Sequence, residues 1–311
     1  MTVLITGGAG FIGSHLIEYF LHHTDYDVIC LDNFCDYYSP ELKRENIDQF
    51  LSNPHFSLVT GDIRDLKLIS KILYDTDFIF HEAAQPGVRI SVQDPQKSHD
   101  VNASGTLNLL RAAIDTNVKK FINASSSSVY GHISYLPFDE KHPTLPVSPY
   151  GVSKLMAEHY CRVFHDLYGL KTCSLRYFTV YGPRMRPDLA IHIFTRNALR
   201  NEPITIFGDG KKTRDFTYVD DVVNANILAM ERGIGEYNIG GGHNVSIQGL
   251  AEEIIRINAS SSSIHYEKPV KGDAEHTYAN TQKAKTELGW SPKVSLEEGL
   301  KRYTEWTRNS P

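Results

Sequence analysis

The sequence predicts an α/β fold, with a doubly wound parallel sheet and a smaller mixed lobe built from the C-terminal third. Three observations predict it. Short β-rich runs alternate with helical patterns through the first half of the chain, which favours a parallel sheet covered by helices. A glycine-rich segment, GGAGFIG at residues 7–13, separates the first run from the first helical pattern. The length of 311 residues suits about two domains.

The elements follow in a clear order. Strands are expected over residues 3–6, 27–31, 56–60, 78–81 and 120–123, and the first helix over residues 11–22. The second half has Pro/Gly-rich loops at 182–187 and 207–212 and an amphipathic helix after Ser246, with Ile247, Leu250, Ala251, Ile254 and Ile255 on one face. The expected division is a nucleotide-binding domain of residues 1–178 plus about 214–240, and a substrate lobe of residues 179–213 and 241–311.

Composition argues against several classes of protein. A net charge of -5 gives no general attraction to nucleic acid or to an anionic membrane. No apolar run approaches the roughly 18 residues of a spanning helix, and the start MTVLIT lacks the pattern of a secretory leader. The four cysteines form no CxxC pair and the 14 histidines no HExxH. We therefore expect a cytoplasmic protein with reduced cysteines and no metal.

The segment INASSSS occurs twice, and its neighbours give the copies different meanings. The copy at residues 257–263 follows the helix after Ser246 and precedes an expected strand at 264–267, so it is interpreted as a polar connector. The copy at residues 122–128 extends an expected parallel strand. Ligands bind beyond the carboxyl ends of such strands, so its serines are candidates for a binding site.

GGAGFIG is typical of a Rossmann-type nucleotide pocket. Gly7, Gly10 and Gly13 lie between a strand and a helix, where the backbone turns sharply and can approach a pyrophosphate closely. Asp32 ends the next strand and is placed to bind the adenosine ribose hydroxyls. Because its carboxylate would repel a 2′-phosphate, the sequence favours NAD over NADP. Asp62 and Ile63 follow the third strand, within reach of an adenine.

SPYGVSK places Tyr150 and Lys154 four residues apart, on one face of a helix. A tyrosine titrates near ~10 and is a poor base at neutral pH. The Lys154 ammonium and a nicotinamide cation are expected to lower the pKa of Tyr150. The pair therefore predicts a tyrosine that exchanges protons with a bound alcohol.

The TGGAGFIG variant, with GxxGxxG spacing, resembles the extended short-chain dehydrogenase/reductase (SDR) family. The resemblance covers nearly the whole chain, because further motifs recur in order: HEAA (81–84), ASSSSVYG (124–131), SPYGVSK (148–154), RYFTVYGPR (176–184), FGDGKKTRDFTYVDD (207–221) and ELGW (287–290). It implies NAD as cofactor and a further set of cofactor-binding residues: Phe11, Ile12, Asn33, Ala83, Ala84, Asn102, Ser125 and Tyr177.

By this resemblance Ser126 holds the substrate oxygen whose proton passes to Tyr150, and Ser127 and Ser128 line the sugar pocket. Nucleotide-sugar dehydratases and decarboxylases of the family carry an acid in this segment, which is absent here. The resemblance therefore favours a UDP-sugar 4-epimerase, in which the substrate is oxidised to a 4-keto sugar and then reduced on the other face.

The resemblance also implies UDP-binding residues: Arg214 on the phosphates, Thr205 and Phe207 around the uracil, Asp273 near the ribose, and Gln85 in the substrate pocket. Two positions depart from the family pattern. Val270 stands where the family often has an arginine, which assigns phosphate binding to Arg214 or Lys271. Glu82 stands where many relatives have leucine.

Two features bear on the sugar. Thr277 falls at a family gate beside the C2 substituent, where a small residue admits an N-acetyl group. Thr179 and Arg186, in FTVYGPRMRPD, match positions that meet the C6 carboxylate in UDP-glucuronate 4-epimerases, and an arginine–carboxylate bond is charge-assisted. We rank UDP-glucose and UDP-N-acetylglucosamine, with their C4 epimers, slightly ahead of UDP-glucuronate.

Other classes stay open. A redox-sensing NAD-binding protein would have no need for the Tyr150–Lys154 pair, an NADP-dependent reductase would conflict with Asp32, and a decarboxylase would use the same uronate pocket. The resemblance further implies a homodimer through helices near residues 102–117 and 150–168, although apolar faces there could equally belong to the core.

Overall fold

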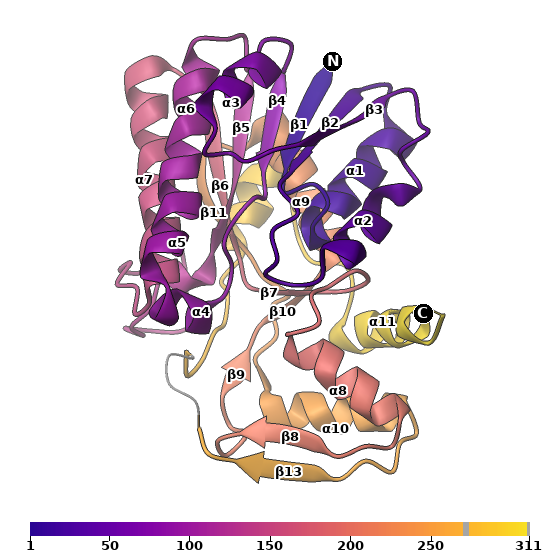
Figure 1. Ribbon diagram of the computed structural model, residues 1–311. Coiled ribbons are helices and arrows are strands. Elements are labelled where there is room, and N and C mark those ends of the chain that lie inside the picture. The colour runs from indigo at the N-terminus through magenta and orange to yellow at the C-terminus, as the bar shows by residue number, and fades with distance from the viewer. Residues whose placement is uncertain (270–273, 310–311) are drawn as a thin grey trace.

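The computed structural model describes residues 1–269 and 274–309. Its main feature is a seven-stranded sheet in the order β11-β6-β5-β4-β1-β2-β3, in which every neighbouring pair is parallel (Figure 1). The strands are β1 (Thr2–Thr6), β2 (Asp27–Asp32), β3 (Phe56–Thr60), β4 (Phe78–His81), β5 (Lys120–Ser126), β6 (Thr172–Tyr177) and β11 (Gly235–Ile239). The predicted doubly wound fold is confirmed.

Helices cover both faces of this sheet, because the side chains of each strand alternate between two cores. Val3 and Ile5 of β1 pack with α1 and α9, whereas Leu4 packs with α3 and α6. In Figure 1, α3, α6 and α7 accordingly lie on one side of the sheet and α1 and α9 on the other. The helices of this domain are α1 (Phe11–His23), α2 (Pro40–Asp48), α3 (Leu66–Leu73), α4 (Val88–Gln93), α5 (Pro95–His99), α6 (Thr106–Ile114), α7 (Pro149–Tyr168) and α9 (Val219–Arg232), with a π-helix at Asp100–Gly105 and a 3₁₀ turn at Ser127–Val129.

A smaller lobe lies below the carboxyl ends of the strands in Figure 1. Its core contains the buried Phe194, Ile204, Leu250 and Tyr303. The strand pairs are β7 with β10, β9 with β12, and β8 with β13. The lobe and its connections comprise β7 (Thr179–Tyr181), α8 (Ala190–Leu199), β8 (Ile204–Phe207), β9 (Thr213–Arg214), β10 (Phe216–Tyr218), β12 (Val245–Ser246), α10 (Ile247–Ile257), β13 (Ile264–Glu267) and α11 (Leu296–Asn309).

The packing differs from the expected domain division in one segment. Residues 284–290 were expected in the lobe, but Ala284, Leu288 and Trp290 are buried in the same core as β11 and α9. The Trp290 indole donates a hydrogen bond to the Asp221 carbonyl oxygen in α9 (2.9 Å). We propose the division otherwise as expected, with residues 284–290 assigned to the Rossmann-type domain.

The second INASSSS segment is a connector, as predicted. It leaves α10 and leads into β13, and Asn201 receives hydrogen bonds from the backbone of Ser261 and from the hydroxyls of Ser260 and Ser261. None of the described helices is long and apolar enough to cross a membrane.

Candidate active site

The glycine segment forms the tight loop between β1 and α1 that the sequence predicted. Gly7 has φ 65°, and a Cβ there would lie 2.7 Å from the Ala83 nitrogen. A Cβ on Gly13 would lie 2.4 Å from the Gly7 carbonyl oxygen. No side chain caps α1 at Gly10, so the amides of its first turn, at Phe11, Ile12 and Gly13, remain available to an anion. This loop fits the pyrophosphate of a dinucleotide.

Asp32 lies beside this loop at the end of β2. One carboxylate oxygen accepts the Ala9 amide (3.1 Å) and the other the Phe34 amide (2.8 Å). Burial raises the pKa of Asp32, while the bond from Phe34 and the charge of Lys43 oppose that rise. Each oxygen keeps a lone pair that can accept a ribose hydroxyl, so the geometry fits the predicted role.

Asn33 and Asp62 extend the same edge of the sheet. The Asn33 side chain donates to Asp62 (2.9 Å), which also pairs with Arg64 (2.8 Å). The bond from Arg64 lowers the pKa of Asp62 to about 2. Ile63 is buried against Gly105, where a Cβ would lie 2.4 Å from the Ile63 Cδ1 atom. These residues form a polar rim beside a buried apolar side chain, as an adenine site requires.

The HEAA segment ends β4 next to the glycine loop. Both His81 ring nitrogens lie 2.8 Å from threonine hydroxyls, those of Thr6 and Thr106. Burial, followed by the charge of Lys154, lowers the pKa of His81 to about 3, so the ring is neutral at physiological pH. The Ala83 amide donates to the Thr6 hydroxyl (3.2 Å), and the next residue, Ala84, is partly buried.

Asn102 lies in the π-helix and connects this segment to α7. Its amide oxygen accepts the Gln85 amide (2.7 Å), and its amide nitrogen donates to the Gln85 carbonyl oxygen (3.1 Å) and to the Ser153 hydroxyl (2.9 Å). Gln85 is buried, and its own side chain donates to the Pro86 carbonyl oxygen (3.2 Å). Asn102 therefore lies behind the site and orients the β4–α4 loop. The Gln85 side-chain amide, in contrast, is bonded to the neighbouring residue of its own loop.

Tyr150 and Lys154 lie in the first turns of α7. Ser148 caps this helix by accepting the Gly151 amide (3.1 Å), and Pro149 is its first residue. The start of the helix, and with it the position of Tyr150 in the first turn, is thereby fixed. The Lys154 ammonium is buried and donates to the Ala124 carbonyl oxygen in β5 (2.7 Å). Tyr150 forms a hydrogen bond with the Ser126 side chain, so helix and strand deliver both hydroxyls to one point.

The expected lowering of the Tyr150 pKa combined the Lys154 ammonium with a nicotinamide cation, and the protein's own groups do not produce it. Burial raises this pKa, and only part of the rise is offset by the Ser126 hydrogen bond and the charge of Arg186. The effect expected from Lys154 is not among these causes; the lysine is directed at Ala124, and burial lowers its own pKa to about 8. Burial therefore outweighs the attraction that the helical spacing suggested.

The four serines divide between two tasks. Ser126 faces Tyr150, and its hydroxyl also accepts the Ser128 amide (3.1 Å) and donates to the Ser128 hydroxyl (3.2 Å). Ser127 and Ser128 begin the 3₁₀ turn and are partly exposed beside this point. The Ser125 hydroxyl instead donates to Glu158. Because the Ser125 side chain points to α7, only the backbone of Ser125 is left for the predicted contact with the nicotinamide.

Glu158 and Arg176, which the sequence reasoning missed, form a buried ion pair beneath the serines. The guanidinium of Arg176 in β6 donates two bonds to the carboxylate of Glu158 in α7 (2.9 and 2.8 Å) and a third to the Tyr130 hydroxyl (3.0 Å). Burial alone would lower the pKa of Arg176, but the bonds to Glu158 raise it. The one available signal was spacing: Tyr150, Lys154 and Glu158 recur every four residues on one helix face.

We expect Glu158→Gln to destabilise the fold by about 3–5 kcal/mol, because it leaves the Arg176 charge buried without a carboxylate. The free energy of unfolding in urea measures this. Glu297→Gln is the matched control: its carboxylate pairs with Arg256 (2.9 Å) and Lys301 (2.8 Å) on the surface, and such pairs contribute about 0–1 kcal/mol. Equal losses for both variants would contradict the assignment.

Residues from the β7–α8 segment enter the site from the lobe side. Thr179 begins β7, and its amide donates to the Asp215 carbonyl oxygen (2.9 Å). The Arg186 guanidinium lies over the Tyr37 ring (5.2 Å to the centroid) and pairs with Asp188 (3.1 Å). Its charge reaches Tyr150, where it lowers the phenol pKa. Arg186 thus belongs to the neighbourhood of the reacting group, with Tyr37 as a partner that the sequence did not reveal.

The remaining predicted substrate residues lie in the lobe. Thr205 and the exposed Phe207 are in β8, and the Arg89 guanidinium of α4 lies over the Phe207 ring (5.9 Å). Arg214, in β9, donates to the Thr213 carbonyl oxygen (2.8 Å). Thr277 is buried, and its hydroxyl accepts the Asp215 amide (3.3 Å). Asp273, like Val270 and Lys271, lies outside the described residues.

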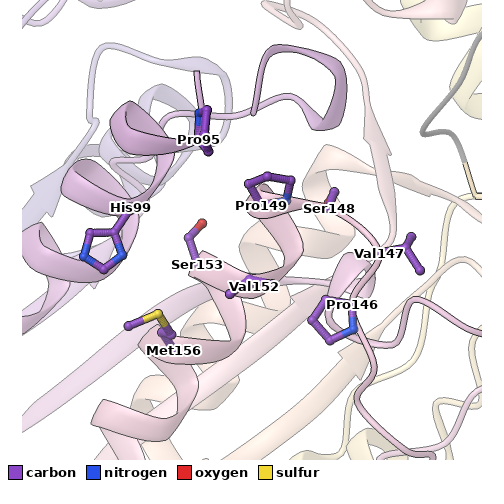
Figure 2. A pocket seen from close by; sticks show the side chains of 9 residues that line it. All are labelled: Pro95, His99, Pro146, Val147, Ser148, Pro149, Val152, Ser153 and Met156. Atoms are coloured by element: carbon purple, nitrogen blue, oxygen red, sulfur yellow. The ribbon is translucent and has the colours of Figure 1, made fainter. Parts of the chain in front are cut away.

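A separate hollow lies on the outer side of α7, near α5 (Figure 2). Its lining includes Pro95, His99, Val152 and Met156, but neither Tyr150 nor Lys154. It is therefore distinct from the candidate active site. Within the part of the chain that the structure describes, no group of three His, Cys, Asp or Glu side chains is arranged to hold a metal ion.

The fold and the site define a class: a short-chain dehydrogenase/reductase with a dinucleotide pocket and a Ser–Tyr–Lys centre. Comparison with known proteins agrees. The family model for GDP-mannose 4,6 dehydratase matches residues 4–303, and the chain belongs to this family of extended SDR proteins. NAD-dependent UDP-sugar 4-epimerases of this family are among the proteins that it resembles.

Three relatives illustrate the similarity. The UDP-glucuronate 4-epimerase of Thermodesulfobacterium geofontis is 38% identical over 311 residues, covering 99% of this chain and 96% of the relative. The crystal structure of the Bacillus cereus UDP-glucuronic acid 4-epimerase with UDP-glucuronic acid and NAD is 41% identical, with a TM-score of 0.94 and 99% coverage of both chains. That of the Thermotoga maritima UDP-glucose 4-epimerase with UDP-glucose is 40% identical, with a TM-score of 0.93 and the same coverage.

Proposed function

We propose that this protein is an NAD-dependent UDP-sugar 4-epimerase whose substrate is UDP-glucuronate. One observation carries the choice of sugar: Arg186 lies close enough to Tyr150 for its charge to lower the phenol pKa. A guanidinium beside the reacting carbon offers a charge-assisted bond to a C6 carboxylate, which UDP-glucose and UDP-N-acetylglucosamine lack. Two of the relatives described above carry the same activity in their names. This reverses the order expected from the sequence.

The dinucleotide would be held by the glycine loop, Asp32 and Lys154. When bound, NAD accepts a hydride from the sugar C4 and later returns it. Tyr150, in the phenolate form that the positive charge of bound NAD would favour, would take the O4 proton as the hydride leaves, and the neighbouring Ser126 hydroxyl would donate a hydrogen bond to that O4 oxygen. The 4-keto sugar then presents its opposite face, and Tyr150 gives the proton back. The two transfers cancel, so the reaction is an isomerisation.

The segment Ser126–Ser127–Ser128 supports epimerisation over dehydration, although the family model is named for dehydratases. No acid stands in this segment to carry out the elimination that a dehydratase needs. Of the acids near this segment, Glu158 is held in its ion pair with Arg176, and Glu82 follows β4 on the cofactor side.

Proton NMR of the purified protein with UDP-glucuronate, UDP-glucose and UDP-N-acetylglucosamine in separate tubes tests this proposal. We expect new anomeric signals of the C4 epimer, forming fastest from UDP-glucuronate. Faster turnover of UDP-glucose or UDP-N-acetylglucosamine would favour the second candidate function, an epimerase of neutral or N-acetyl sugars. The small Thr277 side chain is the feature that supports this candidate. The absence of any epimer with NAD present would overturn both.

We also propose a homodimer formed through α6 and α7. The outer face of α7 carries three exposed apolar side chains, Val152, Val163 and Leu167, on a helix whose opposite face is buried. The hollow of Figure 2 lies on the same face. Light scattering of the purified protein, which gives its mass in solution, tests this proposal.

A further inference from the structure

Glu82 is a carboxylate on the path between the two halves of the proposed cofactor site. It follows β4 directly, and its amide donates to the Thr6 carbonyl oxygen (3.1 Å). Its own carbonyl carbon would lie 3.0 Å from a Cβ on Gly7. Its side chain reaches the other way, and its charge acts on both Tyr150 and Lys154. A dinucleotide that extends from the glycine loop to Tyr150 must pass this residue.

A fixed chain of hydrogen bonds holds the Glu82 side chain. The Tyr177 hydroxyl donates to its carboxylate (2.8 Å), and the buried Asn226 side chain donates to that hydroxyl (2.7 Å). Asn226 is itself fixed by a bond to the Val222 carbonyl oxygen in α9 (2.9 Å). Tyr177 of β6 and Asn226 of α9 therefore hold the carboxylate of Glu82, which follows β4, in one position. A side chain that only filled space would not need such a chain of hydrogen bonds.

The titratable groups coupled to Glu82 are Tyr150, whose pKa is raised, Lys154 and Tyr177. Burial raises the pKa of Glu82 to about 7, and the Tyr177 bond and the charge of Lys154 limit the rise. Burial raises the pKa of Tyr177 well above its ordinary value and lowers that of Lys154 to about 8, and neighbouring His81 is neutral. Glu82 and Lys154 are thus the groups in this set that change charge nearest neutral pH, and Glu82 does so first as the pH rises.

We propose that Glu82 is a positioning residue that sets the balance between oxidised and reduced nicotinamide in the site. This inference rests on the proposed use of NAD, but not on the identity of the sugar. The oxidised nicotinamide ring carries a positive charge that the reduced ring lacks, and a nearby carboxylate in a partly dry pocket attracts that charge. Ionised Glu82 therefore favours the protein with NAD⁺ over the protein with NADH.

This balance matters for an epimerase because the reaction needs both cofactor states in turn. A site that held the reduced form too strongly would accumulate the 4-keto sugar and could release it. A leucine at this position would supply no charge. Glu82 makes the preference for NAD⁺ depend on pH: below about 7 the carboxyl is neutral and the preference weak, and above that pH the carboxylate strengthens it.

The test measures cofactor partition without any sugar. The protein is equilibrated with defined NAD⁺/NADH mixtures, separated from free nucleotide by gel filtration, and the bound reduced fraction is read from the absorbance of NADH. We expect the preference for NAD⁺ over NADH to rise about tenfold between about pH 6 and about pH 7.5, and Glu82→Gln to abolish that rise. Staying below the Lys154 pKa of about 8 limits the contribution of that lysine.

Tyr177→Phe is the matched control, because it removes the hydrogen bond that lowers the pKa of Glu82 but keeps the carboxylate. We expect the same rise in preference, displaced to higher pH. A preference that is flat in the parent protein, or the same pH dependence in Glu82→Gln, would overturn the proposal. A failure of the sugar assay would not affect this result, so the two proposals can fail separately.

Discussion

Tyr150→Phe is expected to lower kcat for C4 epimerisation by about 10³-fold, within the range that general acid–base catalysis supplies. Phenylalanine keeps the ring in the first turn of α7 but has no phenolate oxygen to receive the O4 proton. Nucleotide binding depends on the glycine loop and on the lobe, so KM for the UDP-sugar should change little. Initial rates by proton NMR with UDP-glucuronate measure the effect.

Tyr168→Phe controls for the substitution itself. Tyr168 is the last residue of the same helix, at the end opposite to Tyr150, and is 57% exposed. The Tyr168→Phe variant should therefore retain the parent rate. A Tyr150→Phe protein that keeps more than about a tenth of the parent kcat would contradict the assignment, because loss of the acid–base group should cost at least about 10²-fold. Another base in the site would then have to accept the O4 proton.

Much of the fold could be predicted because the strands of the first domain have strong local signals. β3 and β4 have the predicted bounds, and β1 and β2 differ by one residue each. β5 is the exception, since it runs to Ser126 although residues 120–123 were predicted. Serine has little strand preference, but Ser125 and Ser126 pair with Arg176 and Tyr177 of β6, and this tertiary pairing overrides the local preference.

The site was predictable where it depends on spacing within one element. Tyr150 and Lys154 lie on one helix face because they are four residues apart, and the glycine loop follows from the order of its residues. The protein's own groups do not lower the pKa of Tyr150, because its burial is set by contacts between β5, α7 and the β7–α8 segment, and the effect of a nicotinamide cation stays a prediction. The pair Glu158–Arg176 and the chain Glu82–Tyr177–Asn226 join residues far apart in the sequence, and no local pattern predicts such pairs.

Arg186→Leu is expected to lower kcat/KM for UDP-glucuronate by about 10²–10³-fold, the usual effect of removing one partner of a buried charge pair. UDP-glucose has no carboxylate to lose a partner, so its kcat/KM should change less than about tenfold. Parallel NMR rate measurements with the two substrates give the ratio of the two effects. Equal losses for both sugars would show that Arg186 does not meet a carboxylate.

Arg186 has a second effect that separates charge from hydrogen bonding. Its charge lowers the pKa of Tyr150, so Arg186→Leu should raise that pKa and displace the pH profile for UDP-glucose to higher pH. Arg186→Lys keeps the charge but loses the planar pair of donors that matches a carboxylate. We therefore expect Arg186→Lys to leave the UDP-glucose profile near that of the parent protein while still lowering turnover of UDP-glucuronate. A lysine variant that behaved like the leucine variant in both measurements would mean that Arg186 acts through packing on the Tyr37 ring, since that contact is the feature both variants alter.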